Sequence, residues 1–214
     1  MPTQSVTLHT AGTRLNGDLT LPDEATGLVL FAHGSGSSRH SPRNQAVATH
    51  LNDRGFATLL LDLLTPAEDQ TDAVTRRHRF DIPLLAHRLT GAAHWLTART
   101  TDLPLGLFGA STGAAAALIT AAESPELVKA VVSRGGRPDL ATDALPDVRA
   151  PVLLLVGGHD DTVIKLNEQA AQQLTAPHEL HVIPGATHLF PEPGALEEVA
   201  TAAADWFTHM THPH

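Results

Sequence analysis

The chain has 214 residues, no cysteine and a formal net charge of −9, with 14 lysines and arginines against 23 aspartates and glutamates. Proteins that bind nucleic acid or an anionic membrane usually show the opposite charge balance, so we expect neither partner. The lack of cysteine excludes disulfides, thiolate metal sites and a cysteine nucleophile. The hydrophobic content of 42% is enough to bury a sizeable core.

The N-terminal residues lack the basic start and the apolar stretch of a secretion signal, and no segment approaches the length of a membrane span. We therefore expect a cytoplasmic protein with a single domain over residues 1–214, of which about 208–214 form a flexible tail. The sequence leaves open whether it is a monomer or a homodimer. Histidines cluster in the tail, but a metal site needs several converging ligands, so we expect no metal and no cofactor.

Strand-like and helix-like segments alternate along the chain. A hairpin of Ser5–Thr10 and Leu15–Leu21 comes first. Later strands are expected at Leu28–Ala32, Phe56–Asp62, Leu105–Gly109, Lys129–Ser133, Val152–Val156 and Glu179–Ile183. Helices are expected at Asn44–Arg54, Arg76–Arg99 (with Pro83 in the first turns or at a kink), Thr112–Glu123, Thr162–Leu174 and Gly194–Phe207. This alternation predicts an α/β fold, with a mostly parallel sheet of about eight strands, helices on both faces and one antiparallel edge.

Ser111 lies between the strand "LGLFG" and an alanine-rich helix, in the pentapeptide Gly109-Ala110-Ser111-Thr112-Gly113. A serine between a strand and a helix in a G-x-S-x-G pattern is typical of a nucleophile elbow. The turn is so tight that positions two before and two after the serine favour glycine. The alternative is a glycine-rich turn without chemistry, but the strand–turn–helix context favours Ser111 as a nucleophile.

A serine hydroxyl needs a base, and in this architecture an acid and then a histidine follow the serine along the chain. Asp160 and Asp161 follow the strand "PVLLLVGG", and His188 follows the segment "ELHVIPGAT", which contains the next strand. The spacing G-x-x-D-x-x-V favours Asp160 as the acid, while Asp161 suits the first turn of the next helix; Asp139 is a weaker alternative. All of these lie at carboxyl ends of strands, on the same edge as Ser111.

An oxyanion hole needs two backbone N–H groups. Thr112, the residue after the nucleophile, supplies one at a helix N-terminus. The glycine-containing loop His33-Gly34-Ser35-Gly36 follows the strand "LVLFA", and Ser35 is the best second donor. His33 is expected to order this loop rather than to take part in the chemistry.

Two basic loops lie at the same edge of the sheet and bring Arg39, Arg134 and Arg137. A guanidinium binds a carboxylate or phosphate well, so these residues are candidates to bind an anionic substrate, with Arg134 the best of them. Alternatively Arg137 pairs with Asp139 and the other arginines are solvated.

Four segments, "FAHGSG", "GASTG", "GGHDDTV" and "GATHLF", together resemble the α/β-hydrolase superfamily and, within it, its compact dienelactone-hydrolase-like group. The resemblance implies a hydrolase with a Ser111–His188–Asp160 triad that cleaves a small soluble ester, lactone or thioester through an acyl-enzyme. The chain departs from the dienelactone hydrolases proper, which use a cysteine nucleophile, so the resemblance does not fix the substrate. Fewer than twenty residues separate "KAVVS" from "PVLLLV", which leaves no room for a large lid.

Two alternatives to an esterase remain open. An amidase or peptidase would use the same triad. A non-catalytic binding module on a hydrolase fold is a different class of function, although such proteins usually lose a member of the triad.

Overall fold

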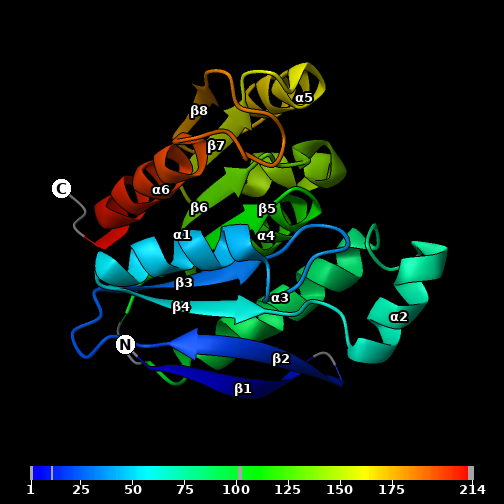
Figure 1. Ribbon diagram of the computed structural model, residues 1–214, viewed down its shortest axis with the longest axis vertical. Coiled ribbons are helices and arrows are strands. Elements are labelled where there is room, and N and C mark those ends of the chain that lie inside the picture. The colour runs from blue at the N-terminus through cyan, green and yellow to red at the C-terminus, as the bar shows by residue number, and fades with distance from the viewer. Residues whose placement is uncertain (1, 11, 101–102, 212–214) are drawn as a thin grey trace.

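One eight-stranded sheet forms the centre of the protein, with the strand order β1-β2-β4-β3-β5-β6-β7-β8 (Figure 1). The computed structural model describes residues 2–10, 12–100 and 103–211. The strands are β1 (Thr3–Thr10), β2 (Thr13–Thr20), β3 (Gly27–Ala32), β4 (Phe56–Leu61), β5 (Leu105–Ala110), β6 (Val128–Arg134), β7 (Val152–Gly157) and β8 (His178–Ile183). β2 pairs in antiparallel fashion with β1 and β4, and all other neighbours are parallel. The predicted architecture is therefore confirmed.

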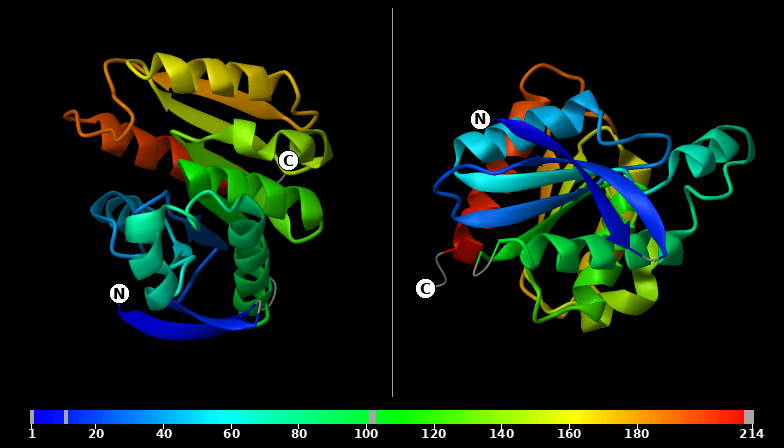
Figure 2. Two further views of the ribbon diagram at one scale, coloured as in Figure 1. Left: turned by 90° about the vertical axis from the view of Figure 1, so that its right-hand side faces the viewer. Right: turned by 90° about the horizontal axis from the view of Figure 1, so that it is seen from below.

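Helices cover both faces of the sheet (Figure 2). The helices α1 (Pro42–Asp53) and α6 (Ala195–Thr211) bury apolar side chains on one face, and α3 (Ile82–Thr97), α4 (Thr112–Glu123) and α5 (Asp161–Ala171) do so on the other. Every residue of β3, β4, β5 and β7 is buried. This double burial is why these strands are continuous apolar runs rather than alternating patterns.

The predicted helix over Arg76–Arg99 is wrong in its N-terminal part. A separate helix, α2 (Pro66–Thr75), ends at Arg76, whose backbone is left-handed with a φ of 56°. The next helix, α3, begins only at Ile82, where the side chain of Asp81 accepts a hydrogen bond from the Leu84 N–H at 3.2 Å. Pro83 lies in the first turn of α3, as expected.

The start of α2 is a capping box. The Thr65 hydroxyl accepts the N–H of Glu68 at 3.3 Å, and the Glu68 carboxylate accepts the N–H of Thr65 at 2.8 Å. The sequence T-P-A-E matches this motif, so it is the signal from which α2 could be predicted. In Figure 1, α2 projects beyond the carboxyl ends of β3 and β4.

Two further expectations concern a lid between β6 and β7 and a flexible C-terminal tail. Between β6 and β7 the chain forms only a short 3-10 helix, η1 (Pro138–Asp147), so a large lid is absent there, as predicted. The helix α6 continues to Thr211, so the expected tail over 208–214 is helical in its first part; residues 212–214 lie outside the described residues. No helix within the described ranges is both long enough and apolar enough to cross a bilayer.

Candidate active site

Ser111 stands at the junction of β5 and α4 in a strained backbone conformation, with φ 51° and ψ −119°. A positive φ costs a residue with a side chain about 1–3 kcal/mol, and such strain is concentrated at functional sites. The Ser111 N–H donates to the carbonyl of Arg134 at 3.1 Å, and the Ser111 carbonyl accepts the N–H of Ala114 at 3.1 Å. These backbone bonds hold the turn so that the side chain projects from the carboxyl edge of the sheet.

The two glycines around Ser111 are required by close contacts between backbones. A Cβ atom at Gly109 would lie 2.4 Å from the Cα of Ala114, and one at Gly113 would lie 2.2 Å from the carbonyl oxygen of Ala32. Both distances are far below van der Waals contact. Glycine occupies both positions because α4 lies directly against the ends of β3 and β5.

Asp160 and His188 are joined by a hydrogen bond of 2.6 Å between Oδ2 and Nδ1. The Asp160 side chain is 17% exposed and that of His188 is 39% exposed. A carboxylate at Nδ1 keeps the proton on that nitrogen and leaves Nε2 free to act as a base. By contrast, Asp161 is exposed in the first turn of α5, the position expected for it if Asp160 is the acid.

The loops that carry this pair are tied together through their backbones. The His159 N–H donates to the carbonyl of Ala186 at 2.9 Å, and the Gly158 N–H donates to that of Ile183 at 2.8 Å. A Cβ atom at Gly157 would lie 2.5 Å from the Ala186 oxygen. Glycine at the end of β7 therefore lets the histidine loop approach closely enough for Asp160 to reach His188.

Ser111 and His188 flank the same peptide unit at the end of β6. The Arg134 carbonyl holds the Ser111 N–H, and a Cβ at the next residue, Gly135, would lie 3.4 Å from Nδ1 of His188. Within the described residues no hydrogen bond joins the Ser111 hydroxyl to His188. Such bonds are often long in unliganded enzymes and tighten when substrate binds.

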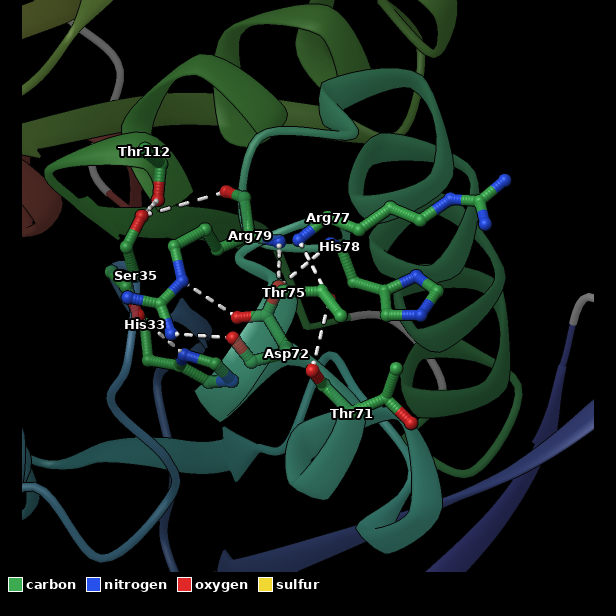
Figure 3. Close-up of polar contacts among 10 residues, drawn as sticks. His33, Ser35, Thr71, Asp72, Thr75, Arg77, His78, Arg79 and Thr112 are labelled. Carbon is green, nitrogen blue, oxygen red and sulfur yellow. Dashed lines mark hydrogen bonds and ion pairs between the residues drawn. The ribbon is translucent and has the colours of Figure 1, made fainter.

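The two predicted oxyanion donors lie side by side. A Cβ atom at Gly34 would lie 3.1 Å from the Cβ of Ser111, so the loop after β3 runs directly past Ser111. The hydroxyls of Ser35 and Thr112 are 3.0 Å apart (Figure 3). Because Thr112 is the first residue of α4, its N–H has no partner within the helix and is available to a developing negative charge.

His33 holds this loop in place through both of its ring nitrogens. Its Nε2 accepts the N–H of Leu63 at 3.0 Å, and its Nδ1 lies 2.9 Å from the carbonyl of Gly34. Burial lowers the pKa of His33, against the hydrogen bond to Gly34. A neutral ring with its proton on Nδ1 satisfies both contacts, so His33 orders the loop, in line with its expected role.

A second support for the loop His33-Gly34-Ser35-Gly36 comes from the segment after α2, which was not predicted from the sequence. The carbonyl of Arg79 accepts a long hydrogen bond of 3.5 Å from the Ser35 hydroxyl. The Arg79 Nε donates to Asp72 Oδ2 at 2.7 Å, and Asp72 is only 1% exposed. Asp72 also accepts the N–H groups of His78 and Arg79 at 2.7 and 3.0 Å (Figure 3).

The three candidate arginines differ in their partners. Arg39 forms ion pairs with Asp62 and Asp18. Arg137 makes two hydrogen bonds to Asp139, at 2.8 and 2.7 Å. Both charges are thus compensated within the protein. Arg134 is buried and pairs with no carboxylate among the residues described.

No group of three or more histidine, aspartate or glutamate side chains that could hold a metal ion occurs within the described ranges. His181 contacts Glu198 at 2.9 Å and lies 3.9 Å from Glu179. His212 and His214 lie outside the described residues.

Solved structures share this fold. A dienelactone hydrolase from Anabaena variabilis is 57% identical and superposes with a TM-score of 0.95, over 97% of each chain. Est1E from Butyrivibrio proteoclasticus superposes with a TM-score of 0.79 over 96% of this chain and 98% of its own, at 18% identity, which supports the fold alone.

Sequence comparisons find two curated relatives and one family model. Two curated relatives from strains of Mycobacterium tuberculosis, named "Putative phosphoribosyl transferase MT0597" and "Putative phosphoribosyl transferase Rv0571c", are 56% identical over 200 residues. That match covers 92% of this chain and 44% of each relative, so the chain spans less than half of their length. The model of the dienelactone hydrolase family matches residues 15–212. The chain therefore belongs to the dienelactone hydrolase family and has the α/β-hydrolase fold.

Proposed function

We propose that this chain is a serine hydrolase that cleaves small carboxylic esters, lactones or thioesters through an acyl-enzyme. One observation carries the proposal: the strained Ser111 elbow lies at the same edge of the sheet as the 2.6 Å Asp160–His188 pair. Family membership supports hydrolytic chemistry, and the lack of cysteine leaves serine as the nucleophile.

In the first half of the reaction, the Ser111 oxygen attacks the substrate carbonyl while Nε2 of His188 takes the hydroxyl proton. The negative charge that develops on the carbonyl oxygen is held by the N–H groups of Ser35 and Thr112. Asp160 stabilises the imidazolium that forms. The tetrahedral intermediate then breaks its bond to the leaving oxygen or sulfur, which receives the proton from His188.

In the second half, water attacks the acyl-enzyme. His188 takes one proton from the water, the acid product leaves, and the proton returns to Ser111. The pair of half-reactions consumes one ester and one water and releases one acid and one alcohol or thiol. The protein groups named here supply nucleophile, base and oxyanion donors.

The activity named for the mycobacterial relatives is not carried over to this chain. Those relatives are more than twice as long as the matched segment, and the geometry around Ser111 fits acyl transfer.

The test is a matched panel of p-nitrophenyl butyrate, the corresponding thioester and p-nitrobutyranilide, assayed with the wild type and Ser111→Ala. We expect turnover of the ester and thioester to exceed that of the anilide, and the variant to lose several orders of magnitude in kcat. Hydroxylamine should divert the acyl group to a hydroxamate, as an acyl-enzyme requires. Preferred cleavage of the anilide would favour an amidase. A folded wild-type protein no faster than Ser111→Ala on all three would overturn the proposal in favour of a binding module.

A further inference from the structure

Arg134 is the last residue of β6, at the edge of the sheet that carries Ser111. Its side chain is directed to the face covered by α1 and α6, where its guanidinium carbon lies 5.9 Å from the centre of the Phe108 ring. Arg134 is 7% exposed, and its Nη1 is buried without a hydrogen-bond partner among the residues that the structure describes. A buried guanidinium nitrogen without an acceptor is costly.

A second arginine lies nearby. Arg43, in the first turn of α1, contributes with its charge to lowering the pKa of Arg134 to about 10, after the larger effect of burial. The Nε of Arg43 is also buried, with no hydrogen-bond partner in the described part of the chain. Within the described ranges, no carboxylate forms an ion pair with either residue.

Other buried or half-buried arginines of this protein are compensated. Arg88 makes two hydrogen bonds of 2.7 Å to Glu68, Arg79 pairs with Asp72, and Arg39 pairs with two aspartates. Arg134 and Arg43 differ from these arginines, because neither pairs with a carboxylate of the described residues. The missing partner is therefore expected to come from outside the chain.

The position of Arg134 connects this pair to the site around Ser111. Its carbonyl accepts the Ser111 N–H at 3.1 Å, and the following glycine packs against the His188 ring. The residue that carries this buried guanidinium therefore directly adjoins both Ser111 and the loop of His188.

We propose that Arg134 and Arg43 form a subsite for a phosphate monoester group on the substrate of the proposed hydrolase. Two guanidinium groups carry two positive charges, and a phosphate monoester carries between one and two negative charges near pH 7, whereas a carboxylate carries one. Its three terminal oxygens can also accept hydrogen bonds from more than one guanidinium group. The inference rests on the proposed function, and it names the substrate class for that site.

Binding is tested first, without any turnover. Inorganic phosphate and glutarate are titrated into Ser111→Ala by calorimetry at constant ionic strength. We expect phosphate to bind more tightly than glutarate, and Arg134→Gln and Arg43→Gln in the same background each to weaken phosphate binding about ten- to a hundredfold. The matched control is Arg54→Gln, at the other end of α1, where the exposed Arg54 pairs with Asp205; it should bind phosphate as Ser111→Ala does.

Hydrolysis is tested second, with two esters of equal chain length, one neutral and one ending in a phosphate. The wild type should favour the phosphate-bearing ester in kcat/KM, Arg134→Lys should keep part of that preference, and Arg134→Gln should lose it while still cleaving the neutral ester. Arg43→Gln, at a half-exposed position, keeps the test valid if Arg134→Gln does not fold.

The two proposals fail in distinguishable ways. Phosphate binding that depends on Arg134, in a protein that hydrolyses no ester, would support the subsite and contradict the hydrolase. Ester hydrolysis with no phosphate binding, and with a preference unaffected by both arginine variants, would overturn the subsite alone. Tighter binding of glutarate than of phosphate would overturn the assignment to a phosphate group.

Discussion

The substitution Asp160→Asn tests how the site around Ser111 would work. In the structure the Asp160 carboxylate is 2.6 Å from Nδ1 of His188 and largely shielded from solvent. An amide at this position either turns its NH₂ group toward Nδ1, which enforces the wrong tautomer, or presents a neutral oxygen that cannot stabilise an imidazolium. In serine hydrolases the corresponding change costs about 10⁴-fold in kcat, which is about 5 kcal/mol of transition-state stabilisation.

We expect Asp160→Asn to lower kcat for p-nitrophenyl butyrate by about 10³–10⁴-fold with little change in KM, because the carboxylate does not contact the substrate. Circular dichroism and thermal unfolding check that the fold is intact. The matched control is Asp161→Asn, one residue along in the exposed first turn of α5, which should change kcat less than threefold, an order-of-magnitude expectation for a surface position. A larger loss in Asp161→Asn than in Asp160→Asn would refute the assignment of the acid.

Three further predictions concern the elbow, the stability and the independence from metal. Gly113→Ala should abolish soluble folded protein or activity, judged by expression and circular dichroism, because the new Cβ would lie 2.2 Å from a backbone oxygen. The pKa of Glu68 is lowered to about 2, first by its hydrogen bond to Arg88, so Glu68 contributes stability above pH 4.5 that is lost as the pH falls toward 2. Glu68→Gln should therefore lower the free energy of unfolding by about 1–2 kcal/mol at pH 7, a value discounted for the solvent around Glu68, and by less at pH 3.5, as measured by urea unfolding; an equal or larger loss at pH 3.5 would contradict this linkage. Ester hydrolysis should survive dialysis against EDTA, and a loss restored by one divalent ion would contradict a mechanism built from side chains alone.

The parts of the fold that local patterns encode could be predicted from the sequence. The apolar runs of β3, β4, β5 and β7 are buried on both faces, and the glycines around Ser111 are required by backbone contacts that any elbow of this kind creates. The segment after β4 was predicted incorrectly because a helical pattern of leucines does not show where the helix starts. The capping box at Thr65–Glu68 and the cap at Asp81 determine those starts.

Side-chain partners that depend on strand order could not be predicted. Arg39 pairs with Asp18 and Asp62, and these pairs depend on β4 lying between β2 and β3 in the sheet. The burial of Arg134 could not be predicted either. It depends on which face of the sheet the Arg134 side chain points to and on the position of α1. The pairing of Arg137 with Asp139, only two residues away, is local, and the sequence analysis named it as an alternative.

The central claim, that Ser111 is an activated nucleophile, is tested most directly by labelling the folded protein with a fluorophosphonate and locating the adduct by mass spectrometry. The Ser111 oxygen attacks phosphorus and displaces fluoride, a reaction that needs His188 to take the hydroxyl proton. We expect one adduct, on the peptide that contains Ser111; it should be absent in Ser111→Ala and form far more slowly in His188→Ala. A folded wild-type protein that forms no adduct, or one whose labelling persists in Ser111→Ala, would contradict it.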